Sequence, residues 1–323
     1  MSTQLWSQES SQGRKRLLWL MNSSARVIVV ALGYSILPLL TSGRPSFSSV
    51  YLQKVFVDLI TGAVYALVLL PLARRLPYRL WVRVIALFIP LYWMAVLGNI
   101  IEAYFFTTFS RVTLTVGAIF LAFPTVIACL LIAWLFPAYK QEQPVPGIWQ
   151  TLRQRPLLSW IWRIAVVSLL YPIFLQYVFG ALTNLFIGQY YHDPAFMAQS
   201  HTTANVPDAI FWLDETLRGL LFALSLLPVL AVMRGRTWPK ILYTALYIVL
   251  LDAAFEAWLS MLSQTAFAMA VRIGEALDLT GDALARGIFI ALFLALPMLT
   301  NKQQQDQATS VKQAQVTEGN DLA

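Results

Sequence analysis

The sequence predicts an all-α, polytopic integral membrane protein with about eight transmembrane helices, arranged as two parallel four-helix repeats. Three observations predict this fold: an apolar composition, eight long apolar segments, and matching residues in the same order in the two halves. Of the 323 residues, 58% are hydrophobic and 12% are charged, whereas a soluble domain has roughly 25% charged residues. We therefore expect a lipid bilayer to be the main partner of this chain.

The apolar segments give the number of helices. A bilayer core about 30 Å thick needs about 20 mostly apolar helical residues. The segments run over 25–40, 52–72, 82–106, 112–136, 161–187, 209–232, 241–262 and 283–299. Arg286 lies near the start of the last one, where we expect its long side chain to reach the membrane surface.

Basic residues in alternate loops predict the orientation. Fifteen Lys and Arg residues lie in the tails and the second, fourth and sixth loops, against four on the other side. Positively charged loops stay in the cytoplasm, so both termini are predicted to be cytoplasmic, in a bacterial-type plasma membrane. The predicted organisation is a cytoplasmic tail (1–24), a first repeat (25–137), a cytoplasmic linker (138–159), a second repeat (160–299) and a disordered cytoplasmic tail (300–323).

The internal repeat is predicted from residues that apolar helices rarely share. Residues 26–36 match 163–173 at six of eleven positions, among them an arginine and a tyrosine in each half. Further along, Gly62 matches Gly219 and Glu102 matches Glu256, and the run FLAFP at 120–124 matches FLALP at 293–297. Four crossings return the chain to its starting side, so the second copy would enter the membrane in the same direction as the first.

Polar and ionisable residues inside the predicted spans form the candidate site. A charge at the bilayer centre costs about 2.5–3.5 kcal/mol, so such residues usually face a bundle interior, a partner or water. Arg218 lies one turn after Asp214 and Glu215, which predicts an intrahelical ion pair. Asp252 and Glu256 share a helix face, so ionising both requires a compensating cation. The complete set of candidates is Asp58, Asn99, Glu102, Asp214, Glu215, Arg218, Asp252 and Glu256.

Three functions are compatible with this pattern. The first is a transporter of a small cation or proton-coupled solute through a cavity between the repeats. Its carriers would be Glu102, Asp252 and Glu256, with Asp58, Asp214 and Glu215 lining the outer mouth. The second is a non-catalytic membrane scaffold or accessory subunit that uses small-residue faces for packing. The third is a metal-dependent membrane enzyme using the outer acids with His192 or His201, although these two histidines lack ligand spacing.

The sequence assigns no catalytic residue, no metal site and no cofactor. Walker A, GxSxG and GxGxxG fingerprints are absent, and the single Cys129 excludes a disulfide framework. The run DETLRG at 214–219 has one residue too few for the EExxxRG signature of intramembrane CAAX-type proteases. The net charge of +7 comes from loops between apolar spans, so it indicates membrane topology and no nucleic acid partner. The sequence leaves the oligomeric state open.

Overall fold

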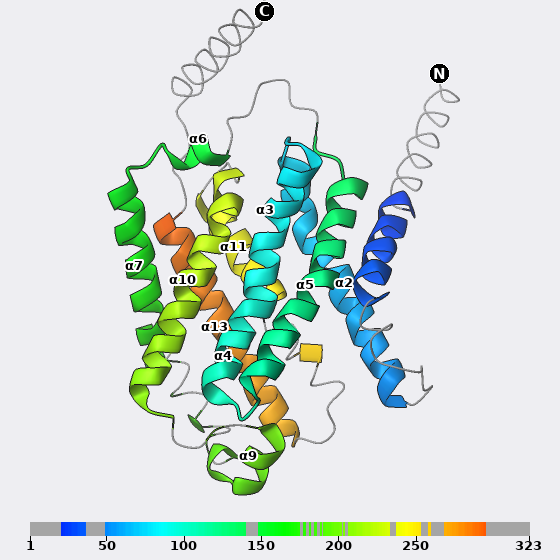
Figure 1. Ribbon diagram of the computed structural model, residues 1–323. Helices are drawn as coiled ribbons and strands as arrows, with labels where there is room; N and C mark the ends of the chain where they lie inside the picture. The colour runs from blue at the N-terminus through cyan, green and yellow to red at the C-terminus, as the bar shows by residue number, and fades with distance from the viewer. Residues whose placement is uncertain are drawn as a thin grey trace, which may run out of the picture.

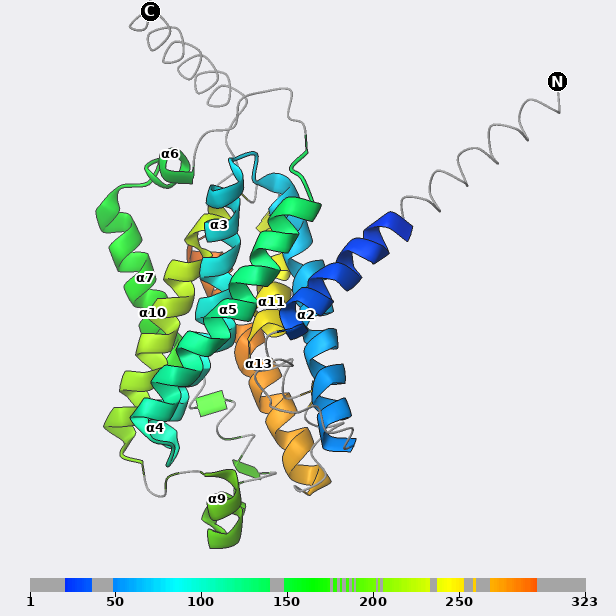
Figure 2. The ribbon, with the colours of Figure 1, turned by 45° about the vertical axis from the view of Figure 1, so that its right-hand side comes forward.

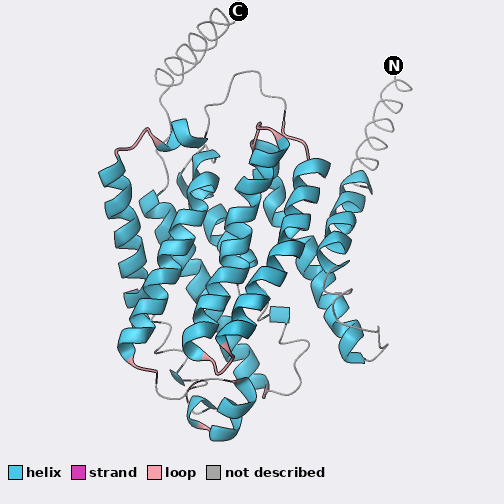
Figure 3. Cartoon of the chain, viewed as in Figure 1, coloured by secondary structure: helices cyan, strands magenta, loops and turns pink. Residues whose placement is uncertain are grey.

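The described part of the protein is helical. The computed structural model describes residues 21–36, 49–139, 148–174, 177–178, 181, 184–185, 188, 190–201, 203, 206–232, 237–252, 258–259 and 268–294. Within these ranges short turns join the helices and no strand occurs (Figures 1 and 3). Residues 21–36 are helical. The other elements are α2 (Ser49–Arg75), α3 (Leu80–Tyr92), η1 (Trp93–Gly98), α4 (Asn99–Phe106), α5 (Arg111–Leu135), α6 (Ile148–Leu152), α7 (Leu157–Phe174), η3 (Tyr190–His192), α9 (Pro194–Ser200), α10 (Asp208–Val232), α11 (Thr237–Leu251) and α13 (Met269–Leu294).

Five of the described helices are long and apolar enough to cross a membrane. They are Leu52–Arg75, Leu80–Phe106, Arg111–Leu135, Leu157–Phe174 and Asp208–Val232. These helices fall on the second to sixth predicted segments, whose apolar helical character is confirmed, for the fifth segment over 161–174. The first predicted segment overlaps the helix at 21–36, and residues 37–40 lie outside the described ranges. The described chain thus has the architecture of a multi-pass membrane protein.

The last two predicted segments differ from the observed helices. α11 ends at Leu251, Asp252 forms a bend, and residues 253–257 of the predicted segment 241–262 lie outside the described ranges. α13 begins at Met269, well before the predicted start at 283. Its first half contains Arg272, Glu275 and Asp278, and Asp282 follows directly after it. These charges lower the hydropathy of the first half, so a search for apolar runs places the start of the helix too late.

The outward faces of the helices are strongly apolar. α5 exposes Val112, Phe123 and Trp134, and α7 exposes Leu157 and Leu158. Charged residues such as Asp214, Arg218 and Arg286 are instead buried inside the bundle. A surface of this kind suits lipid, because a soluble monomer rarely exposes large continuous apolar patches.

The helices form two groups that pack against each other. In the second half of the chain, α7, α10, α11 and α13 pack together, with the most extensive contacts between α11 and α13 and between α10 and α7. In the first half, α3 packs on α5 and α2 contacts both. α10 joins the groups by packing against α3, η1 and α4, and α2 packs against α11 (Figures 1 and 2). The interface between the two halves therefore includes α4 and α10, and these two helices carry most of the candidate residues.

One proposed correspondence between the halves does not fit the helices. Phe120 lies in the first half of α5, whereas Phe293 is next to the last residue of α13. These two positions are at different depths in their helices. The match of 120–124 with 293–297 is therefore wrong as a structural equivalence.

We expect Gly287→Ala to destabilise the bundle. A Cβ atom at Gly287 would lie 2.4 Å from the Cα atom of Ala245 in α11, so the two helices would have to separate. Overpacking of this kind costs about 1–3 kcal/mol. Gly117→Ala is the matched control, because a Cβ atom there meets nothing within 4 Å and alanine favours helix. Thermal unfolding in detergent should show a lower midpoint for Gly287→Ala than for the unmodified protein, and no decrease for Gly117→Ala. Equal midpoints for the two variants would contradict the close packing.

Candidate functional site: a buried charge cluster

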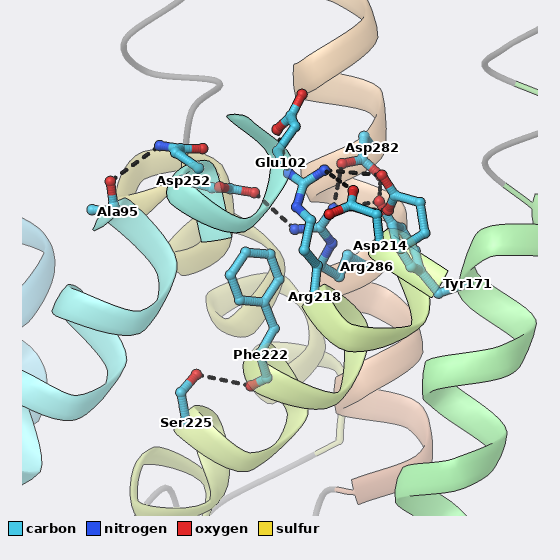
Figure 4. Close-up of polar contacts among 12 residues, drawn as sticks. Ala95, Glu102, Tyr171, Asp214, Arg218, Phe222, Ser225, Asp252, Asp282 and Arg286 are labelled. Atoms are coloured by element: carbon cyan, nitrogen blue, oxygen red, sulfur yellow. Dashed lines mark hydrogen bonds and ion pairs between the residues drawn. The ribbon is translucent and has the colours of Figure 1, made fainter. Parts of the chain in front are cut away.

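Seven charged side chains from four helical elements meet inside the bundle. Five are carboxylates and two are guanidinium groups, and ion pairs connect them. Glu102 lies four residues before the end of α4 and Asp214 six residues after the start of α10, and these two helix ends lie at the same end of the bundle (Figure 1). We call this set the charge cluster, and Figure 4 shows most of it. Its members are Glu102, Asp214, Glu215, Arg218, Asp252, Asp282 and Arg286.

Arg286 is a fully buried member of the charge cluster. It lies in α13 with no exposed surface. Its guanidinium nitrogens lie 2.6 Å from Asp282 Oδ2, 3.1 Å from Asp252 Oδ2 and 3.8 Å from Glu215 Oε2. The prediction that Arg286 reaches the membrane surface is wrong, because three carboxylates from three helical elements hold it in the interior.

Aromatic rings complete the surroundings of Arg286. The guanidinium carbon lies 4.2 Å from the centre of the Phe222 ring and 4.4 Å from the centre of the Tyr171 ring. Arg286 also donates a hydrogen bond to the Tyr171 hydroxyl, which in turn donates to Asp282 (Figure 4). Cation–π contacts are strongest where the cation has lost its water. Tyr171 and Phe222 therefore fix the position of the guanidinium as well as stabilising its charge.

Arg218 joins the two halves of the protein. Its Nη1 atom lies 2.9 Å from Glu215 Oε1 and 3.8 Å from Asp214 Oδ2, both in its own helix α10. The intrahelical ion pair predicted from the spacing is present. Its Nη2 atom lies 3.1 Å from Oε2 of Glu102, which comes from α4 in the first half. Arg218 thereby pairs with carboxylates from both groups of helices.

Local irregularities of the helices position the cluster. The span that carries Glu102 contains the π-helical turn η1, and such turns are frequent at functional sites. A Cβ atom at Gly98, the last residue of η1, would lie 2.9 Å from the Phe222 ring, so only glycine leaves room for that ring. α11 stops at Leu251, which places Asp252 beside the carbonyl groups at the helix end. The negative end of the helix dipole adds to the charge that Arg286 compensates.

The charge cluster is rich in negative charge. With all groups ionised, five carboxylates exceed two guanidinium groups by three charges. Among the described residues, no hydrogen bond reaches either carboxylate oxygen of Asp214, Oε2 of Glu215 or Oδ1 of Asp252, and all four atoms are buried. Uncompensated charge of this kind is costly away from water. The arrangement therefore favours protons or bound cations on the carboxylates.

The cluster contains five of the eight residues predicted from the sequence: Glu102, Asp214, Glu215, Arg218 and Asp252. Two others lie elsewhere in the described structure. Asp58 is half-buried in α2, where the charge that acts on it is that of Lys54, one turn away. The side-chain amide of Asn99 donates to the carbonyl of Ala95, 3.1 Å away in its own helical span. Glu256, the eighth, lies outside the described residues.

Sequence reasoning missed four residues of the site: Tyr171, Phe222, Asp282 and Arg286. Asp282 and Arg286 are four residues apart, which is the same ion-pair spacing that identified Asp214 and Arg218. That signal was available. It was not used because the predicted span started after Asp282 and left Arg286 near a helix end.

The two histidines, His192 and His201, come from elements that contribute no side chain to the charge cluster. His192 ends η3, and His201 follows α9. The carbonyl of His201 accepts a hydrogen bond of 2.8 Å from the backbone of Thr108, and its ring packs on Phe109. Within the described ranges, no group of three or more His, Cys, Asp or Glu side chains is arranged to hold a metal ion.

The comparisons with known proteins leave the function to be argued from this geometry. The chain matches no protein-family model, no curated protein and no solved structure.

Proposed function

We propose that this chain is a membrane transporter that moves protons or another small cation through the charge cluster at the boundary between its two halves. The observation that carries the proposal is the excess of three negative charges in the charge cluster, whose side chains other than that of Glu102 are buried. Intramembrane ionisable residues that face a bundle interior commonly mark ion pathways and proton relays. The bacterial-type plasma membrane and the cytoplasmic termini are part of this proposal and rest on the distribution of basic residues.

Glu102 is the member of the cluster best placed to exchange a cation with the surroundings. Its side chain is 40% exposed, whereas the other ion-paired side chains of the cluster are at most 6% exposed. It lies four residues before the end of α4, or about 6 Å along the helix. Arg218 connects it to Glu215 and Asp214 deeper in the bundle. A cation bound at Glu102 could therefore move on to the carboxylates of Glu215 and Asp214, which lie deeper in the bundle.

The proposed pathway uses a duplicated architecture, and equivalent contacts support the duplication. Arg26 donates a 2.7 Å hydrogen bond to the carbonyl of Leu135, at the end of α5. Arg163, its counterpart in the predicted repeat, donates a 2.8 Å hydrogen bond to the carbonyl of Phe293, at the end of α13. In each half an arginine of the first helix thus binds the end of the fourth. This contact pairs Leu135 with Phe293, in place of the Phe120 match.

The predicted glycine pair supports the same correspondence. A Cβ atom at Gly62 would lie 2.9 Å from the Cα atom of Ala31, and one at Gly219 would lie 3.2 Å from the Cα atom of Ser168. Ala31 and Ser168 hold the same position in the matched segments 26–36 and 163–173. The first and second helices of each half therefore approach at equivalent points.

The two halves differ at the ring pair beside the cluster. In the first half, the Tyr34 and Tyr65 rings contact each other edge to face, with centroids 5.5 Å apart. Tyr171 and Phe222 occupy the matching positions in the second half, and there the guanidinium of Arg286 contacts both rings. We infer that only the second half carries the ion site, and that the first half supplies Glu102 to it.

A scaffold role is the second candidate. It is favoured by the fact that both cluster arginines have carboxylate partners, as buried groups that only hold helices together also do. The two candidates differ in what a neutral substitution does. A structural carboxylate can be replaced without loss of activity if the fold survives, whereas a carrier cannot.

The direct test is Glu102→Gln, which keeps the size of the side chain and removes its charge. Purified protein is reconstituted in liposomes that contain a pH-sensitive dye, and proton entry is driven by a potassium diffusion potential. We expect the substitution to lower the proton flux by at least about tenfold, since it removes a positioned proton carrier. The same liposomes with a sodium-sensitive dye measure sodium as the alternative cation.

Asp58→Asn is the matched control. It removes a half-buried carboxylate from a membrane helix outside the charge cluster, so its flux should equal that of the unmodified protein. If the unmodified protein carries neither ion, or if Glu102→Gln carries both at the normal rate, the transport proposal is wrong.

A further inference from the structure

The corner between α6 and α7 has the features of a lipid-binding element. α6 lies across the ends of the neighbouring helices, at the end of the bundle opposite α9 (Figures 1 and 2). Trp149 in α6 and Leu157 and Leu158 at the start of α7 are 65–75% exposed. Large apolar side chains at a helix corner of this kind suit the boundary between lipid headgroups and acyl chains.

The corner is fixed in place by its own contacts. The indole nitrogen of Trp160 donates a 2.9 Å hydrogen bond to the carbonyl of Leu152, so the first turn of α7 holds the end of α6. The backbone of Arg155 donates to the same carbonyl. Ile148 and Leu152 pack against the core of the bundle. The exposed side chains of the corner are therefore presented on a rigid base.

Three arginines add positive charge to this base. Arg153, Arg155 and Arg163 lie in the corner and α7, and residues 143–192 contain no Asp or Glu. The guanidinium of Arg153 lies over the Trp149 ring, and that of Arg155 lies over the Trp160 ring. Burial, together with the nearby charge of Arg163, lowers the pKa of Arg155. Arg155 also donates a 3.3 Å hydrogen bond to the carbonyl of Leu294, so its guanidinium is held at the corner. The positive charge of these groups would attract an anion.

We propose that the corner formed by α6 and the start of α7 binds the phosphate headgroup of an anionic phospholipid. Arg153 and Arg155 would contact the phosphate, and the exposed Trp149, Leu157 and Leu158 would contact the upper part of the acyl chains. The apolar side chains favour a lipid over free phosphate, because phosphate alone would leave them in contact with water. Basic residues beside a membrane favour anionic lipids by electrostatic attraction. This inference does not depend on the transport proposal.

Native mass spectrometry of the full chain in detergent provides the test. The protein is mixed with phosphatidylglycerol or with phosphatidylcholine of the same acyl chains, and retained lipid is counted. We expect preferential retention of phosphatidylglycerol, and a loss of about tenfold in Arg153→Gln combined with Arg155→Gln. Arg153→Gln alone should give a smaller loss, and because Arg153 is exposed this variant tests the site even if the double variant folds poorly.

Arg111→Gln is the matched control for Arg153→Gln. Arg111 is also exposed and its guanidinium also lies over an exposed ring, that of Tyr104, but it begins α5 at the opposite end of the bundle. Its lipid retention should equal that of the unmodified protein. Equal retention of the two lipids, or unchanged retention in Arg153→Gln, would overturn the proposal. Displacement of the lipid by inorganic phosphate would also overturn it, by showing that the site selects phosphate alone.

Discussion

Replacing Arg286 by leucine is expected to prevent stable folding of the protein. The substitution removes the partner of Asp282 and Asp252 and leaves both carboxylates buried without a counter-charge. Breaking a buried ion pair by removing one partner costs about 3–5 kcal/mol. We expect the loss of unfolding free energy to be at the upper end of this range, because two close carboxylates lose the same partner and Phe222 loses its cation–π contact. The measurement is the yield of monodisperse protein in detergent and the midpoint of its thermal unfolding.

Two further variants separate charge from packing in this result. Arg163→Leu removes a half-buried arginine whose guanidinium binds the Phe293 carbonyl and the Ser159 hydroxyl, so it leaves no carboxylate of the charge cluster unpaired and should lower the midpoint only slightly. Arg286→Leu combined with Asp252→Asn and Asp282→Asn removes the excess charge and should recover most of the lost yield. If the combined variant is as unstable as Arg286→Leu alone, packing of the Arg286 stem, and not charge, explains the defect.

The helices of this protein could be predicted from sequence where one physical effect dominates. Hydropathy alone identifies α2, α5 and α10, because each contains a window of 18 residues that is apolar on average. It fails for α13, in which Arg286 pairs with Asp252 and Glu215 from other elements and with Asp282 of the same helix. It also fails for α11, which ends at Leu251, next to the Asp252 that pairs with Arg286. Both failures occur where tertiary ion pairs offset a local cost that a sequence window counts in full.

Most acids of the candidate site could be predicted from the sequence, whereas the contacts between its helices could not. Acids in apolar segments are conspicuous, so Glu102, Asp214 and Asp252 were found from the cost of burying charge. Asp58 met the same criterion and lies apart, since depth in a helix does not determine which face a residue occupies. Tyr171 was visible only as a repeat match with Tyr34. Its contact with Arg286 depends on the crossing of α7 and α13, which no local pattern contains.

Asp214→Asn is expected to abolish transport while leaving the fold intact. Asp214 has no exposed surface, its carboxylate oxygens accept no hydrogen bond within the described structure, and its nearest cation, Arg218 Nη1, is 3.8 Å away. An unsatisfied buried carboxylate contributes little to stability, so the neutral amide should leave the unfolding midpoint equal or higher. A carrier that can no longer bind a proton or cation should lower the flux by on the order of a hundredfold. Unfolding in detergent and dye-based flux in liposomes give the two readouts on one preparation.

Asp282→Asn is the comparison that makes this result decisive between transporter and scaffold. Asp282 lies 2.6 Å from Arg286 and accepts from Tyr171, so its loss should lower the unfolding midpoint as the loss of a structural group does. A transporter predicts that Asp214→Asn is stable and inactive, because the least satisfied acid is the one free to exchange its cation. A scaffold predicts that every stable variant behaves like the unmodified protein. Normal flux in a stable Asp214→Asn protein would remove Asp214 from the pathway and leave the charge cluster as the ionic core of a scaffold.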